Sequence, residues 1–82
     1  MRFNYDPEHN IAYIRFREKA GGVESIRVSD ELVVDISPDG KIYGLELLNA
    51  NEQLEIVEGG QFVFTNESTG KTVQLPIASD RA

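Results

Sequence analysis

Residues 32–48 read LVVDISPDGKIYGLELL, and this stretch decides the fold. A β-prone run lies on either side of the turn sequence Ser37-Pro38-Asp39-Gly40-Lys41. Pro38 suits the first central position of a type I turn, and Gly40 supplies the positive φ that a three-residue hairpin loop requires. The stretch therefore predicts a tight β-hairpin closed by this turn.

The register of this hairpin decides which side chains share a face. Uninterrupted pairing back from the turn places Asp35 opposite Tyr43 and Val33 opposite Leu45. Because side chains alternate across a strand, those four are expected on one face. The other face is expected to carry Leu32, Val34, Ile36 and Ile42. Both faces would then be apolar in part, which is unusual for an antiparallel sheet with one side in water.

Turn residues and alternating apolar residues also mark the rest of the chain. Asn49 or Asn51 can cap a helix near residues 51–58, and Gly59 can end it. Further strands are predicted at residues 2–5, 11–17, 23–28, 61–66 and 71–77. We therefore predict an α+β fold: a mainly antiparallel, twisted sheet of five to seven strands with one short helix, in a single domain over residues 1–82.

Composition excludes several classes of protein. Fourteen acidic residues against eight basic ones give a formal charge of −6, which disfavours nucleic acid as a partner. The absence of cysteine excludes zinc–thiolate sites and thiol nucleophiles. No signal peptide is recognisable, and no apolar run is long enough to cross a bilayer. We expect a cytoplasmic protein that does not bind membranes.

Few residues suggest chemistry. His9 is the only histidine, and it lies in a predicted surface turn without a nucleophile beside it. Asp35 lies in an apolar strand, where an unpaired carboxylate is costly. One interpretation is an acid or metal ligand acting with Glu46 or Asp39; the favoured one is a structural carboxylate bonded to Tyr43 or to an arginine. We therefore predict no catalytic residues, metal site or cofactor, and hold Asp35 and Glu46 as candidate functional carboxylates.

Several short segments follow one another along the first two thirds of the chain. They are Tyr5-Asp6-Pro7-Glu8, Ala12-Tyr13-Ile14-Arg15-Phe16, Val34-Asp35, Asp39-Gly40-Lys41-Ile42, Gly44-Leu45-Glu46-Leu47-Leu48 and Asn49-Ala50. In this order and spacing they resemble the bacterial YuzE-like domain-of-unknown-function family, over about residues 2–51. The resemblance implies a small bacterial α+β protein with no established activity, and it supplies no catalytic residues. Residues 61–77 depart from the family pattern and are interpreted as an added C-terminal hairpin.

The expected function is that of a non-enzymatic interaction module that self-associates as a homodimer. A small chain without disulfides buries little apolar surface, so it gains by burying more against a copy of itself. The candidate interface residues are Tyr13, Arg15, Val33, Tyr43 and Leu45. One alternative is an acidic, antitoxin-like partner of a basic protein, since the resemblance implies toxin-like genes near some members. A further alternative is a small metal-dependent hydrolase centred on Asp35.

Overall fold

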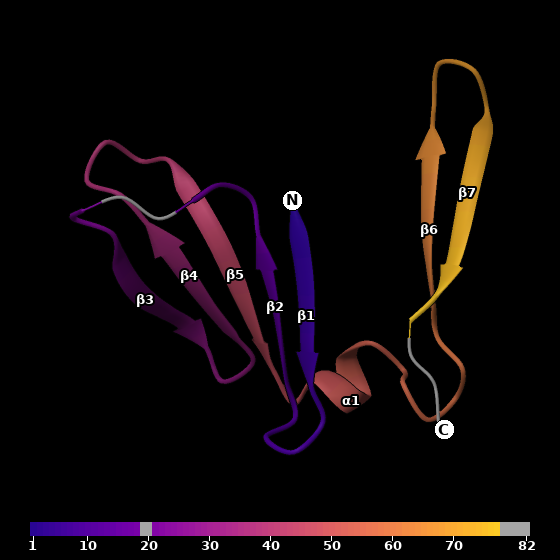
Figure 1. The fold of residues 1–82 in the computed structure, drawn as a ribbon, viewed down its shortest axis with the longest axis horizontal. Helices are drawn as coiled ribbons and strands as arrows, with labels where there is room; N and C mark the ends of the chain where they lie inside the picture. Colours follow the sequence, from indigo (N-terminus) through magenta and orange to yellow (C-terminus); the bar gives the residue numbers. More distant parts are fainter. Residues whose placement is uncertain (19–20, 78–82) are drawn as a thin grey trace. The chain divides into compact units, whose positions relative to one another are not determined.

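A computed structural model describes residues 1–18 and 21–77 of the chain (Figure 1). Within these residues it contains seven strands in two antiparallel sheets and one short helix, so the predicted α+β class is confirmed. The chain divides into two compact units, Met1–Ala50 and Asn51–Ala82, and each is described by itself. No helix in the described residues is both long enough and apolar enough to span a membrane.

A five-stranded antiparallel sheet makes up the first unit. Its strands are β1 (Arg2–Asp6), β2 (Ile11–Arg15), β3 (Glu24–Ser29), β4 (Leu32–Ile36) and β5 (Ile42–Leu48). They lie in the order β1-β2-β5-β4-β3, as Figure 1 shows. The pairs β1–β2, β3–β4 and β4–β5 are hairpins of successive strands, and β2 pairs with β5 to join the β1–β2 hairpin to the other three strands. β1 and β3 are therefore the edge strands.

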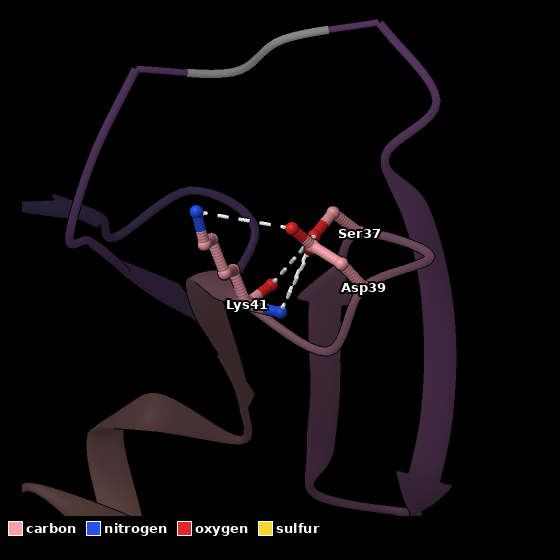
Figure 2. A network of polar contacts seen from close by, with 3 residues as sticks. All are labelled: Ser37, Asp39 and Lys41. Carbon is pink, nitrogen blue, oxygen red and sulfur yellow. Dashed lines mark hydrogen bonds and ion pairs between the residues drawn. The ribbon is translucent and has the colours of Figure 1, made fainter.

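The turn between β4 and β5 has the predicted form. Gly40 adopts a φ of 90°, and its N–H donates to the Ser37 carbonyl at 2.9 Å. The Ser37 N–H donates to the Lys41 carbonyl at 3.0 Å, which closes the loop. Figure 2 shows the Asp39 carboxylate accepting a hydrogen bond from the Ser37 hydroxyl and forming an ion pair with Lys41. Asp39 Oδ2 lies 3.8 Å from Lys41 Nζ. The hydrogen bond from Ser37 is the main reason that the pKa of Asp39 is lowered.

The pairing of β4 with β5 differs from the predicted register. Ile36 lies opposite Ile42, but the next pair is Asp35 opposite Gly44, so Tyr43 is an extra residue in a β-bulge. The predicted pairs of Asp35 with Tyr43 and Val33 with Leu45 are therefore wrong. The carbonyl of Tyr43 accepts a hydrogen bond from the Phe16 N–H at 2.9 Å, so the bulge is fixed by the neighbouring β2 segment. Beyond the bulge every β5 side chain moves to the face opposite to the one predicted.

One face of this sheet carries an apolar row, with one residue from each strand. The members lie directly opposite one another across the sheet: Phe3, Ile14, Leu45, Val34 and Ile26. The end members remain accessible, since Phe3 is 43% and Ile26 is 46% exposed. Among the described residues, Ala12 and Ala50 are the buried hydrophobic residues, so the described core is small. The apolar row is thus only partly covered within its own unit.

The helix is shorter than predicted. α1 spans Ala50–Gln53, and hydrogen-bonded turns replace the rest of the predicted helix near residues 51–58. Glu55 adopts a φ of 55°, in the left-handed region, which is incompatible with a continuing right-handed helix. The Gly60 N–H then donates to the Glu55 carbonyl at 2.8 Å. The predicted helix end at Gly59 is therefore wrong: Gly59 has a φ of 79°, but it lies in the turns that follow the helix.

The second unit contains a β-hairpin. β6 (Gln61–Asn66) and β7 (Lys71–Pro76) pair along their whole length without a register shift, where the sequence predicts a C-terminal hairpin. Phe62 lies opposite Leu75, and Phe64 lies opposite Val73. These four side chains share one face, and each is about half exposed. The hairpin therefore presents apolar side chains that its own two strands do not cover.

Candidate functional site

The polar face of the five-stranded sheet, opposite the apolar row, gathers the residues with chemical potential. The register sets Asp35 on β4 opposite Ser25 on β3 and opposite Gly44 on β5. Gly44 lies in turn opposite Arg15 on β2. Tyr13 lies two positions before Arg15, so alternation places it on the same face. Four strands thus bring these side chains to one part of the sheet.

Asp35 is the centre of a carboxylate network. The Tyr13 hydroxyl donates to Asp35 Oδ2 at 2.6 Å, and the Ser25 hydroxyl donates to Asp35 Oδ1 at 2.7 Å. Asp35 is 4% exposed and is the buried charged residue of the described chain. Hydrogen bonds to both oxygens compensate for the cost of removing the carboxylate from water. The structural interpretation of Asp35 named Tyr43 or an arginine as its partner, whereas the tyrosine that donates to Asp35 is Tyr13.

The same contacts change the acidity of Tyr13. Desolvation by burial is the largest cause, and the hydrogen bond and charge of Asp35 add to it, raising the pKa of Tyr13 to about 12. Both effects disfavour the phenolate, because it would be a second negative charge in a poorly solvated place. Tyr13 therefore acts as a hydrogen-bond donor across the neutral pH range. It is not poised to serve as a general base there.

Gly44 makes room for this hydrogen bond. A β-carbon at position 44 would lie 2.6 Å from Tyr13 Cζ and 2.9 Å from the Ile14 carbonyl oxygen. Real β-carbons do not approach other atoms so closely, so a larger residue here would displace the Tyr13 ring. The glycine thus serves close approach and not an unusual backbone angle.

Arginine side chains lie beside the network. Arg15 Nη1 lies 3.6 Å from a Glu18 carboxylate oxygen, and Arg15 Nε is buried without a hydrogen-bond partner among the described residues. The Arg17 guanidinium lies 5.4 Å from the centroid of the Tyr43 ring. At an exposed site such a cation–π contact contributes about 0.5–1 kcal/mol. The two arginines thus have different partners, a carboxylate for Arg15 and an aromatic ring for Arg17.

The structure brings together most of the residues predicted from sequence as site residues, but not all. The members that share the polar face are Tyr13, Arg15, Val33, Asp35 and Glu46. Leu45 belongs to the apolar row on the opposite face, and Tyr43 occupies the bulge. Glu46 lies opposite Val33 and Tyr13, on the same face as Asp35. Sequence reasoning missed Ser25 and Gly44, which are recognisable only once the register is known.

A second cluster of potential metal ligands lies in the β1–β2 turn. Ligand atoms of Asp6, Glu8 and His9 all lie within 4.8 Å of one another, and all three residues are exposed. Asp6 Oδ2 lies 2.8 Å from His9 Nδ1, and Asp6 Oδ1 accepts hydrogen bonds from the Glu8 and His9 N–H groups. The hydrogen bond with His9 is the main reason that the pKa of Asp6 is lowered. The cluster is thus explained by a turn in which the aspartate side chain accepts hydrogen bonds from the backbone N–H groups two and three residues later.

Comparison with known proteins identifies the first unit. Residues 2–51 match a family described as protein of unknown function, DUF2283, and the chain belongs to that family. The match ends beside the boundary of the first compact unit, so it covers the five-stranded sheet and leaves β6 and β7 outside. Searches of curated proteins and of solved structures found no match.

Proposed function

We propose that this chain is a YuzE-like, non-enzymatic interaction module that self-associates as a homodimer. The observation that supports this is the partly covered apolar row of the five-stranded sheet. Covering apolar surface contributes about 25 cal/mol per Å², and the end members Phe3 and Ile26 still have 43% and 46% of their surface exposed. A two-fold dimer would place the same face of both copies in contact, so one row can cover the other.

Sedimentation velocity of an Ile26→Glu variant tests this proposal. The wild-type chain should sediment as a dimer at micromolar concentrations, and the variant should shift towards monomer because it buries a charge in the contact. Ile26 is 46% exposed, so the substitution should leave the folded monomer intact. Circular dichroism checks that it does.

Arg27→Gln is the matched control. Arg27 is the next residue on β3, so its side chain lies on the opposite face, and the substitution changes the net charge by the same amount as Ile26→Glu. It should leave the dimer unchanged. A monomeric wild-type chain would defeat the proposal. If both variants weakened the dimer equally, the apolar row would not be the contact between the copies.

An acidic, antitoxin-like role towards a basic protein is the second candidate. The net charge of −6 supports it, because opposite charges accelerate association and select partners. Purification from the native host, followed by mass spectrometry, should then recover a basic protein in stoichiometric amount, released by salt. Recovery of the chain alone, in low salt, would count against this role.

A metal-dependent hydrolase centred on Asp35 has less support. Both Asp35 oxygens already accept hydrogen bonds, from Tyr13 and Ser25, so a metal ion would have to displace them. Calorimetric titration with magnesium, manganese, calcium and zinc should show no binding tighter than about millimolar, the weak end of known calcium sites. A stoichiometric micromolar site that Asp35→Asn abolishes would instead establish this candidate.

A further inference from the structure

The outward backbone groups of β6 can be assigned from one hydrogen bond. The Ile77 N–H donates to the Gly60 carbonyl at 3.1 Å, so this pair is hydrogen-bonded. Antiparallel ladders alternate hydrogen-bonded and non-hydrogen-bonded pairs. The hydrogen-bonded pairs of the hairpin therefore include Phe62 with Leu75 and Phe64 with Val73, and the alternate residues of β6 direct their N–H and C=O groups away from β7. Those outward residues on β6 are Gln61, Val63 and Thr65.

The two edges of the hairpin differ in how they resist pairing. On β7 the outward positions are Thr72, Gln74 and Pro76, and Pro76 has no N–H to donate. Lys71 adds a charge at the start of that strand. Proline and lysine are common means by which edge strands avoid pairing. β6 reads QFVFTN, with no charge, no proline and no bulge, so it is the open edge.

We propose that β6 pairs antiparallel with β6 of a second copy, across a two-fold axis at Val63. The outward groups of Gln61, Val63 and Thr65 then meet the same groups of the partner, and the four strands form one continuous sheet. In this register Phe62 lies opposite the partner's Phe64, in a non-hydrogen-bonded pair where side chains are closest. The apolar face of the hairpin thus continues without a break into that of the partner.

Charge favours a second copy as the occupant. The whole chain carries −6, so most contacts between two copies bring like charges together. Between Gln61 and Pro76 the charged residues are Glu67 and Lys71, whose charges cancel. A two-stranded hairpin is also marginal by itself, and additional strands stabilise it. β6 therefore offers an acidic chain an uncharged, self-complementary contact.

This pairing rests on the self-association proposed above, but it uses a different surface. The apolar row belongs to the five-stranded sheet, and β6 lies in the other unit. Either contact can therefore fail without the other, provided that the experiment reports on β6 directly. Sedimentation alone does not, so a distance across the β6 contact is required.

A spin label at the hairpin turn supplies that distance. The chain contains no cysteine, so Ser68→Cys carries a single label, placed in the turn and outside both strands. In the proposed pairing the two turns point in opposite directions from the axis at Val63. A strand rise of about 3.4 Å per residue then separates the two labels by roughly 30 Å. Pulsed electron paramagnetic resonance of the labelled full chain should give a narrow distance there.

Two proline variants of the labelled chain test the contact. Val63 and Gln74 lie opposite each other, and both N–H groups point out of the hairpin. Val63→Pro removes a donor from the β6 edge and should abolish the distance near 30 Å. Gln74→Pro disturbs the same pair from the β7 side and should retain that distance. Val63→Lys keeps the N–H, but it sets two like charges against each other at the axis and should also abolish the distance.

The outcomes separate the two proposals. Absence of the distance from the labelled parent, or its persistence in Val63→Pro and Val63→Lys, would overturn β6 pairing. Its loss in Gln74→Pro as well would show that hairpin integrity, and not the β6 edge, is being measured, and would also overturn it. A dimer that is sensitive to Ile26→Glu but lacks the distance would leave self-association intact and reject β6.

Discussion

The ring of Tyr13 lies so close to Gly44 that a β-carbon at position 44 would stand 2.6 Å from Tyr13 Cζ. This approach lets the Tyr13 hydroxyl reach Asp35, which is on the strand beyond Gly44. Glycine at position 44 is thus a requirement of the carboxylate network, and the network can be tested by adding one carbon atom.

Gly44→Ala should destabilise the protein by about 1–3 kcal/mol, the usual cost of adding volume to a filled site. Urea unfolding measures this. Gly21→Ala is the matched control, because a β-carbon there meets nothing within 4 Å and should have little effect. In a Tyr13→Ala background the cost of Gly44→Ala should fall, since the ring that it displaces is absent. Equal costs in both backgrounds would contradict the close approach.

Tyr13→Phe should cost about 1–3 kcal/mol, because it leaves a buried carboxylate with one fewer donor. Tyr43→Phe removes a hydroxyl from the other tyrosine near the network and keeps its ring beneath Arg17. The control should be close to neutral in the same unfolding experiment. If instead Tyr43→Phe were the more costly change, the hydrogen-bond donor to Asp35 would be wrongly assigned.

Alkaline pH should weaken the fold through Tyr13. Its pKa is about 12 in the native state, against 10.0 for an ordinary tyrosine. The native chain therefore holds the phenol proton more tightly, and the Tyr13 contribution to stability is complete below pH 10 and lost as the pH rises to about 12. The difference in unfolding free energy between wild type and Tyr13→Phe should shrink over this window. A difference that stays constant across it would show that Tyr13 ionises normally.

Gly40→Val should destabilise the protein by roughly 1–3 kcal/mol, since a β-branched residue is strained at a positive φ. Gly40 has a φ of 90° and open space around it, so the cost comes from the backbone and not from a clash. Chemical denaturation measures it. Gly21→Val is the control, because Gly21 lacks a positive φ, and it should cost less stability than Gly40→Val. A larger cost for Gly21→Val would refute this turn.

Local signals predicted the turns well, and long-range contacts explain what was missed. Ser37 to Lys41 contain all the chemistry of their own turn, so the hairpin could be predicted from residues 32–48 alone. The bulge at Tyr43 could not, because the group that fixes it is the Phe16 N–H, which belongs to another part of the sheet. That single extra residue moved Leu45 to the opposite face.

The candidate site was predicted in part for the same reason. Asp35 stood out as a carboxylate in an apolar strand, but its donors Tyr13 and Ser25 come from strands on either side of the β4–β5 pair. The helix was overestimated because caps and acidic residues predict where a helix starts, and the left-handed Glu55 ends it after one turn.

Strand order also determines how this sheet folds. β1 with β2, and β3 with β4 and β5, are joined by short connections or turns, whereas β2 and β5 are separated by two intervening strands. Loop closure becomes more costly with length, and distant pairings slow folding. The two local halves should therefore form early and meet late, along the line where Tyr13 crosses Gly44. We expect the meeting of the two halves to limit the folding rate, so substitutions at this seam should slow refolding more than they accelerate unfolding.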